Sequence, residues 1–297
     1  MSKTIRLVIP QWQGGNRFAY SFGSRLLEWL TPETKDETIE IPISNIQEED
    51  IQDGIAFKKL LLDQSEATYS MLKEKNPDKV VVYGGDCSVE LAPFTYLLER
   101  YQDDIAILWL DRHGDISIPG ETTNYHAMVL ASFLGEGDKD FSDFVKTKID
   151  CNHLLLAGVN DTKEFDRVVG KKYNFKNIPS NDFQDSSDAV LDKLKEMNVK
   201  NIIVHFDLDV LDLASFRSQS SANPDVYMER LKLIKPGSSF NSIGRLLNDI
   251  EVEFNIVGLG ITEYLPWDVM ALSNLLSQLP LIKSKEKSVL PFYDLKY

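Results

Sequence analysis

Short runs of apolar residues, rich in β-branched side chains, recur along this chain, and each is about as long as one strand. Most are apolar at every position instead of alternating with polar residues. Unbroken runs of this kind are expected of strands that are covered on both faces in a parallel sheet. The six runs cover residues 5–10, 79–83, 105–110, 153–159, 201–206 and 255–261.

Between these runs lie segments with apolar residues three and four positions apart, which is the spacing of one helix face. They cover residues 20–30, 55–73, 89–101, 189–197, 239–253 and 269–282. Strands that alternate with helices predict a layered α/β fold, here as a single domain over 1–297 with a long loop at 215–226. Ligands bind such folds at the carboxyl ends of the parallel strands, so polar residues after an apolar run are the functional candidates.

Composition and charge narrow the classes of function. The 297 residues are 43% hydrophobic and 26% charged, which is typical of a globular protein. A net charge of −14 argues against a nucleic-acid partner, because neutralising phosphates requires clustered lysine and arginine. The acidity suits metal cations or cationic substrates, although it also simply keeps a protein in solution.

The chain has no apolar stretch of about 18 residues, so no membrane partner is expected. The N-terminal apolar run is too short for a signal peptide, which predicts a cytoplasmic protein. Two cysteines, Cys87 and Cys151, do not make a disulfide framework.

Polar clusters follow three of the apolar runs, in the segments VVVYGGDCS, IAILWLDRHGD and IIVHFDLDVLD. In the second, Asp111, His113 and Asp115 would project to one side if the strand continued. Carboxylates crowded at a buried strand end raise one another's pKa and destabilise the fold unless a cation compensates. Asp207 and Asp209 repeat the pattern. Carboxylates with an imidazole suit Mn²⁺, Fe²⁺ or Zn²⁺, and four carboxylates suit two ions better than one.

Five motifs, in order, resemble those of the arginase/agmatinase (ureohydrolase) family. GGDCS at 84–88 resembles the family's GGDHS, DRHGD at 111–115 its DAHxD, and HFDLDVLD at 205–212 its SFDxDxxDP. NYHAM at 124–128 resembles the segment that carries the family's active-site histidine, and GLGITEYLPW at 258–267 its late segment with a glutamate near a proline. The resemblance spans roughly residues 80 to 270, and the five motifs are specific in combination.

The resemblance implies a three-layer α/β/α sandwich with a mostly parallel central sheet. It also implies a metal-dependent hydrolase that cleaves a guanidino C–N bond of a small cationic compound and releases urea. Two divalent ions are implied, Mn²⁺ by family, with Zn²⁺ or Fe²⁺ open because of the cysteine. The metal-ligand positions carried over are Cys87, Asp111, His113, Asp115, Asp207 and Asp209.

Four further roles follow from the resemblance. His126 matches the family's proton-shuttling histidine, and Asp115 could accept a proton during the reaction. Glu263 matches the carboxylate that pairs with the guanidinium, and Asn124 matches a position that helps hold the amino-acid end of the substrate in arginases. The family commonly forms trimers or hexamers, which predicts a homo-oligomer.

The chain departs from the family pattern at three places. Cys87 stands where the family has a histidine ligand; a thiolate prefers Zn²⁺ or iron, and the residue either ligates or is a small buried apolar side chain. His205 stands where the family has serine; it could compensate for the lost imidazole, but a hydrogen-bond donor or core histidine is the favoured interpretation. The loop after Asp212 lacks the family's Pro and TGTP-like stretch, which leaves arginine, agmatine and other guanidino compounds open.

Two other functions compete with the ureohydrolase. A related metal amidohydrolase would act on an acetylpolyamine or formimino group, but an acidic residue at Glu263 suits a cationic reacting group better than a neutral amide. A non-catalytic or single-metal paralogue would have a binding or regulatory role, with one metal site lost through Cys87. Metal content distinguishes these classes.

Overall fold

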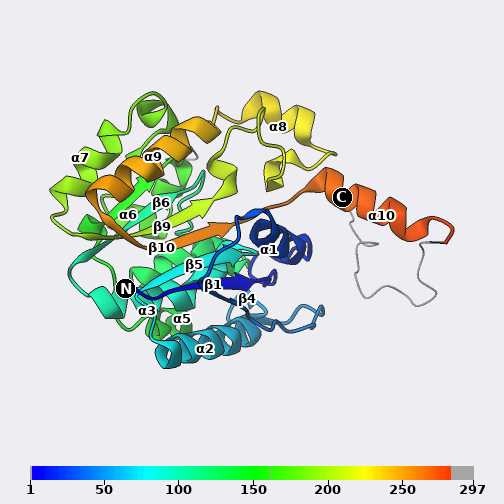
Figure 1. Ribbon diagram of the computed structural model, residues 1–297, viewed down its shortest axis with the longest axis horizontal. Coiled ribbons are helices and arrows are strands. Elements are labelled where there is room, and N and C mark those ends of the chain that lie inside the picture. Colours follow the sequence, from blue (N-terminus) through cyan, green and yellow to red (C-terminus); the bar gives the residue numbers. More distant parts are fainter. Residues whose placement is uncertain (1, 161, 282–297) are drawn as a thin grey trace.

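The computed structural model describes residues 2–160 and 162–281. Its centre is an eight-stranded sheet in the order β2-β1-β5-β10-β9-β6-β7-β8, and every pairing in it is parallel (Figure 1). The strands are β1 (Thr4–Ile9), β2 (Glu37–Glu40), β5 (Lys79–Gly84), β6 (Ile105–Leu110), β7 (Leu154–Ala157), β8 (Lys176–Ile178), β9 (Asn201–Asp207) and β10 (Asn255–Thr262). A separate antiparallel hairpin joins β3 (Ile51–Gln52) to β4 (Ile55–Ala56).

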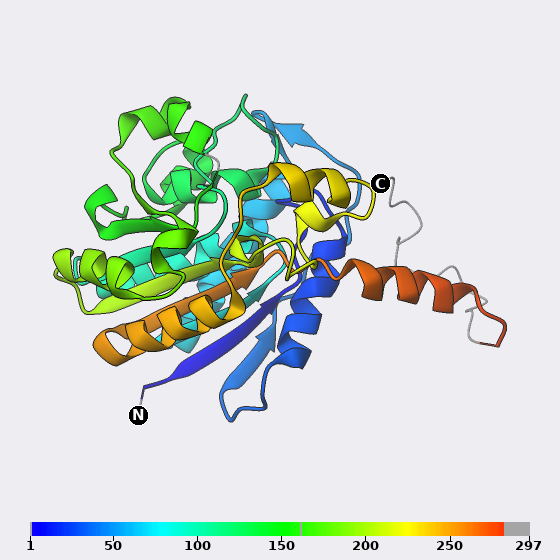
Figure 2. The same cartoon turned by 90° about the horizontal axis from the view of Figure 1, so that it is seen from above.

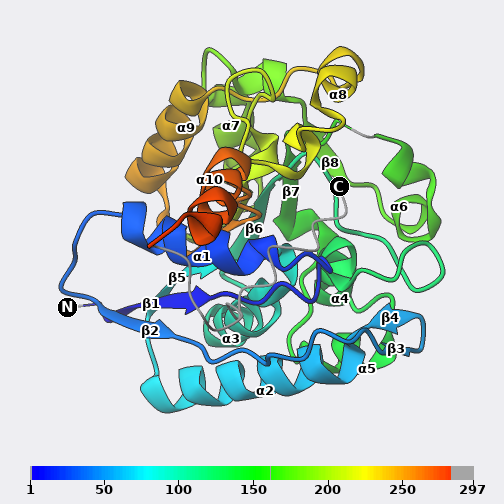
Figure 3. The same ribbon diagram turned by 90° about the vertical axis from the view of Figure 1, so that its right-hand side faces the viewer.

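Helices cover both faces of the sheet, which makes three layers (Figure 3). One face carries α2 (Lys58–Lys75), α3 (Leu91–Tyr101), α4 (Val129–Phe133) and α5 (Lys139–Phe144). The other carries α1 (Ala19–Leu30), α7 (Asp188–Glu196) and α9 (Phe240–Glu253), with the short α6 (Val168–Lys172) and α8 (Tyr227–Leu233) in the connections. Helix α10 (Trp267–Gln278) extends away from the body (Figure 2). The predicted α/β/α sandwich with a parallel sheet is confirmed.

Strand β6 shows why the apolar runs are unbroken. All six of its residues are buried. Ile105, Ile107 and Trp109 pack into the core under α3, while the residues between them pack into the core under α7 and α9. A strand with helices on both faces buries every side chain, so the sequence cannot alternate.

The predicted strands are all present, but the edges of the sheet were not predicted. Strand β2 reads ETIE and is mostly exposed, and β8 has three residues, so neither carries an apolar run. The helix predicted from residue 55 begins only at Lys58, because Ile55 belongs to the hairpin and Phe57 has a left-handed φ of 56°. The helix predicted over 269–282 begins earlier, at Trp267, and Ile282 lies outside the described residues.

The sheet order determines where a site can form. Strands β5, β10, β9 and β6 are consecutive neighbours in the middle of the sheet, and all four run in the same direction. Their carboxyl ends therefore meet at one edge, where polar residues of distant motifs become neighbours. None of the described helices has both the length and the apolar character needed to span a bilayer.

Candidate metal centre

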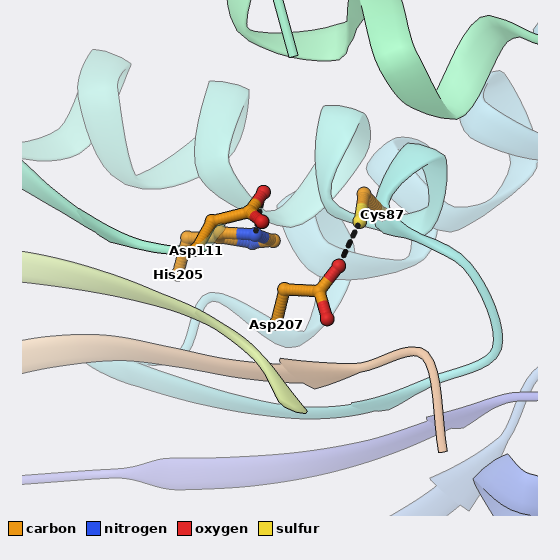
Figure 4. Close-up of side chains that lie close together, drawn as sticks. All are labelled: Cys87, Asp111, His205 and Asp207. Carbon is orange, nitrogen blue, oxygen red and sulfur yellow. Dashed lines mark hydrogen bonds and ion pairs between the residues drawn. The ribbon is translucent and has the colours of Figure 1, made fainter. Parts of the chain in front are cut away.

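The first group of possible metal ligands lies where β5, β6 and β9 end. Its members are Cys87, Asp111, His205 and Asp207, all buried, with their ligand atoms within 4.8 Å of one another (Figure 4). The Cys87 Sγ atom lies 3.4 Å from Asp207 Oδ2, and His205 Nε2 lies 3.5 Å from Asp111 Oδ2. One thiol, one imidazole and two carboxylates thus face a common centre.

The second group consists of Asp111, His113 and Asp209. His113 Nδ1 lies 3.5 Å from Asp111 Oδ1 and 3.2 Å from Asp209 Oδ2. Strand β6 ends at Leu110, so a turn, and not strand alternation, brings these side chains together. The His113 backbone N–H donates to Asp111 Oδ1 at 2.7 Å and holds that turn. Asp111 belongs to both groups, with Oδ1 toward His113 and Oδ2 toward His205.

A third group contains Cys87, His126 and Glu263. His126 Nδ1 lies 2.5 Å from Glu263 Oε1, and the Tyr20 hydroxyl donates to Glu263 Oε2 at 2.7 Å. Cys87 Sγ lies 3.6 Å from Glu263 Oε1. Glu263 follows β10 directly and has a φ of 65°, which turns the chain so that its carboxylate points inward. Both oxygens of Glu263 are therefore engaged within the chain.

The remaining predicted site residues lie close by. Asp115 is buried with a φ of 48°, and its backbone oxygen accepts from Leu130 and Ala131. Its carboxylate is not among the grouped ligand atoms found in the described chain. Asn124 is half-buried and immediately precedes the short helix Tyr125–Met128, which carries His126.

Burial and crowding of the carboxylates raise the pKa values of Asp207 and Asp115. Burial, then the nearby Asp209 and Glu263, raises the pKa of Asp207 well above its ordinary value. Burial and the charge of Asp111 do the same to the pKa of Asp115. Burial also raises the pKa of the Cys87 thiol, with Glu263 adding to the effect. A bound cation would reverse all three trends, since it favours carboxylate and thiolate.

At Asp111, His126 and His205, neighbouring charges shift the pKa in the direction that favours the charged form of the side chain. Burial raises the pKa of Asp111, but His113 and His205 outweigh it and leave that pKa far below its ordinary range. Burial alone would lower the pKa of His126, but Glu263 outweighs it and raises the pKa to about 9. Burial alone would also lower the pKa of His205, but Glu90 and Asp111 outweigh burial and raise that pKa to about 10.

The residues present fit divalent cations. Three buried polar atoms, His205 Nε2, Asp115 Oδ2 and Asp209 Oδ2, make no hydrogen bond to any described residue, although Asp209 Oδ2 keeps its ion-pair contact with His113 at 3.2 Å. Buried polar atoms are satisfied in the great majority of cases, so a convergence of unsatisfied ones indicates a missing partner. Metal ions would engage all three and offset the repulsion among the carboxylates.

Two residues of the centre do not follow from the sequence motifs. Glu90, immediately before α3, lies with Oε2 2.6 Å from His205 Nδ1, and both side chains are fully buried. Tyr20, in α1, donates a hydrogen bond to Glu263, which lies 243 positions later in the sequence. The only sequence signal for Glu90 is its place three residues after Cys87, and Tyr20 has none beyond its apolar helix.

Comparison with known proteins gives the family of this chain. The model of the arginase family matches residues 20–224. A Staphylococcus aureus arginase is 26% identical over 187 residues, which cover 59% of this chain and 61% of that protein. A Plasmodium falciparum arginase is 26% identical over 222 residues, covering 71% of this chain and 50% of that protein. The matched part of the chain thus spans less than two thirds of the length of these relatives.

Solved structures share the fold. The Entamoeba histolytica arginase in complex with L-ornithine superposes with a TM-score of 0.74 at 16% identity, covering 90% of this chain and 92% of that one. The Bacillus caldovelox arginase gives 0.71 at 19% identity, with coverage of 90% and 92%. Since the family model covers more than half of the residues, this chain belongs to the arginase family.

Proposed function

We propose that this chain is a binuclear-metal hydrolase that cleaves a guanidino C–N bond of a small cationic compound and releases urea. The observation that carries the proposal is the placement of Asp111, which offers one oxygen to each of two ligand groups. A carboxylate shared in this way suits a pair of divalent ions. Glu263, a buried anion, lies beside the same centre.

The first ion would be held by Cys87, Asp111, Asp115 and Asp207, and the second by Asp111, His113, Asp207 and Asp209. When bound, such ions supply a nucleophile at neutral pH, because they lower the pKa of water from about 15.7 to about 7. Mn²⁺ is the family expectation, and the thiol leaves Zn²⁺ or Fe²⁺ open.

Glu263 would bind the cationic end of the substrate. Burial raises its pKa, but His126 and Tyr20 outweigh burial and lower it, so the carboxylate is charged at neutral pH. A charged carboxylate and a guanidinium form paired hydrogen bonds, which orient the reacting carbon toward the metal ligands. Tyr20 would keep the carboxylate in place by donating to Oε2.

His126 would supply the proton for the leaving amine. With a pKa of about 9, its imidazole carries a proton at neutral pH. Guanidinium binding to Glu263 would compete with the His126 contact at Oε1 and free that proton for transfer. Asp115 would accept a proton, because a bound cation would favour its carboxylate over the protonated form that burial favours.

A cavity lined in part by Tyr264, the residue after Glu263, would take the far end of the substrate. This cavity of about 520 Å³ is lined by residues of the 215–226 loop, by Tyr227 at the start of α8, and by Tyr264 and Trp267. Its size is typical of small-molecule sites. The loop is the segment that departs from the family motif, so arginine, agmatine and related guanidino acids remain alternatives, with Asn124 a further candidate contact.

Urea release from a panel of guanidino compounds, measured after loading with Mn²⁺, Zn²⁺ or Fe²⁺, tests the proposal. We expect about two ions per chain and turnover of one compound class, which Glu263→Gln abolishes while metal content is kept. Absence of urea under every loading would instead support a paralogue with a binding or regulatory role.

A further inference from the structure

We infer that His205 is a metal ligand through Nε2, that Glu90 orients it, and that the resulting Cys87–Asp111–His205–Asp207 position selects Zn²⁺ over Mn²⁺. The inference takes from the proposed function only that metal binds this centre, and not that the chain turns over a substrate.

The geometry of His205 is that expected of a metal-ligating histidine. Its side chain is fully buried at the end of β9, and Nε2 makes no hydrogen bond to any described residue. Nε2 points toward Asp111 Oδ2 at 3.5 Å, a distance too long for a good hydrogen bond. A ring nitrogen of His205 lies within 4.8 Å of the ligand atoms of Cys87 and Asp207 (Figure 4), and Nδ1 is already engaged by Glu90.

The orientation of the ring is fixed on its other side. Nδ1 lies 2.6 Å from Glu90 Oε2, and the imidazole stacks on Trp109 with ring centroids 3.6 Å apart and planes 17° apart. A ligating histidine usually donates its second ring N–H to a carboxylate, which sets the tautomer and leaves the other nitrogen free for metal. Glu90 would thereby place the proton on Nδ1 and direct the lone pair of Nε2 at the centre.

The backbone makes room for this arrangement. A Cβ atom on Gly260, in β10, would lie 1.7 Å from Glu90 Oε1. A side chain at that position would displace the Glu90 carboxylate from His205. The glycine therefore leaves room for the carboxylate beside Nδ1 of His205.

Cys87 and His205 together change the chemistry of the first position. The motif at 84–88 has cysteine where the family pattern has histidine, and the motif at 205–212 has histidine where that pattern has serine. The imidazole is thus supplied from β9 instead of from the turn after β5. A thiolate with an imidazole is a donor set that Zn²⁺ prefers, whereas Asp111, His113 and Asp209 remain a set suited to Mn²⁺.

The competing explanation is that His205 is a permanent imidazolium that neutralises Asp111 and Glu90. In that case metal would bind without it. Metal binding, which needs no turnover, separates the two explanations and keeps this inference distinguishable from the proposed function.

The test uses the full chain, stripped of metal and titrated with Zn²⁺, Co²⁺ and Mn²⁺ by calorimetry. Wild type should bind one Zn²⁺ much more tightly than a second, and Co²⁺ should give a thiolate charge-transfer band. His205→Asn should weaken the tighter Zn²⁺ at least 10-fold while the band persists, and Glu90→Gln should weaken it about 10–100-fold. Cys87→Ala should remove the band.

The chain offers matched controls. Cys151→Ala and His153→Asn change the second cysteine and a histidine outside the three ligand groups, and both should leave Zn²⁺ affinity unchanged. Unchanged Zn²⁺ affinity in folded His205→Asn would overturn the inference, and so would equal affinity of the wild type for Zn²⁺ and Mn²⁺ at the tighter position.

X-ray absorption at one Zn²⁺ per wild-type chain decides the matter if the variants do not fold. One sulfur at about 2.3 Å with an imidazole nitrogen at about 2.0 Å is expected. His126→Asn should keep that imidazole, because His205 supplies it. Sulfur without any imidazole in the wild type, or loss of the imidazole in His126→Asn, would contradict the assignment.

Discussion

His126 Nδ1 lies 2.5 Å from Glu263 Oε1, and Tyr20 donates to the second oxygen of the same carboxylate at 2.7 Å. The carboxylate proposed to bind the substrate is therefore held from both sides before any substrate arrives. Substrate binding must exchange one of these contacts. The His126 contact is the one whose loss would be useful, because it frees a proton next to the leaving group.

Removing the Tyr20 hydroxyl should weaken substrate binding without abolishing chemistry. A hydrogen bond to a charged group contributes about 1.5–3 kcal/mol, so Tyr20→Phe should lower kcat/KM by roughly 10–100-fold, mainly through KM. Steady-state urea release measures this. Tyr96→Phe is the control, because Tyr96 is a buried tyrosine that donates to Pro77 O at 2.7 Å, away from the centre. An unchanged KM in Tyr20→Phe would remove Tyr20 from the site.

The His126–Glu263 pair should make the metal-free protein more stable at lower pH. The folded pKa of about 9 exceeds the unfolded value of about 6.5. The pair's contribution is thus full below about 6.5 and is lost as the pH rises through 9. Denaturant midpoints at pH 6.5 and pH 9.5 should differ more in wild type than in His126→Gln. Equal pH dependence in the two proteins would show that the pair is uncoupled from folding.

Asp207→Asn should stabilise the metal-free chain and remove its response to metal. The raised pKa of Asp207 shows that its charged form is disfavoured in the fold. The amide oxygen can still accept the Asp209 N–H that Oδ1 accepts at 2.7 Å. Loss of about 1 kcal/mol of repulsion corresponds to a Tm about 2–4 °C higher.

Scanning calorimetry with and without Zn²⁺ or Mn²⁺ tests both expected effects of Asp207→Asn, the higher Tm and the lost response to metal. In wild type, free metal at 100 times Kd should add about 2.7 kcal/mol of stability. The variant should lose most of that increment. A wild-type Tm that does not respond to any divalent ion would argue against a metal centre in this chain.

Gly260→Ala should destabilise the fold, because its Cβ cannot coexist with Glu90 as placed. Overpacking a core of this kind costs about 1–3 kcal/mol. Gly244→Ala is the matched control: Gly244 lies in α9, and no heavy atom comes within 4 Å of its added Cβ. That change should be neutral or stabilise by up to about 1 kcal/mol. The measurement is the midpoint of urea denaturation. Equal shifts of that midpoint in the two variants would contradict the packing argument.

Burial explains which parts of the fold the sequence could predict. Strand β6 has the same bounds as the apolar run 105–110, because helices cover the strand on both faces. Within the described residues the edge strand β2 pairs with β1 alone. It reads ETIE, so the hydrogen bonds that make it a strand leave no mark in its composition.

The same reasoning applies to the site. Asp111, His113 and Asp209 lie in compact motifs after apolar runs, and the structure brings them together. The pairing of His205 with Glu90 joins residues 115 positions apart, and nothing local marks either as the other's partner. The sequence favours a hydrogen-bond donor or core histidine at 205; the structure shows a buried ring held through Nδ1 by Glu90, whose Nε2 makes no hydrogen bond to a described residue.

The order of strands in the sheet has a consequence for when the proposed metal centre can form. Strand β10 is the last to be synthesised, yet it lies between β5 and β9 and pairs with both. A growing chain therefore carries the turns with Cys87 and Asp207 on two strands whose shared neighbour does not yet exist. Non-local pairings of this kind form late in folding. Capture of the ions should accordingly follow insertion of β10, so that metal occupancy reports the completion of folding during biosynthesis.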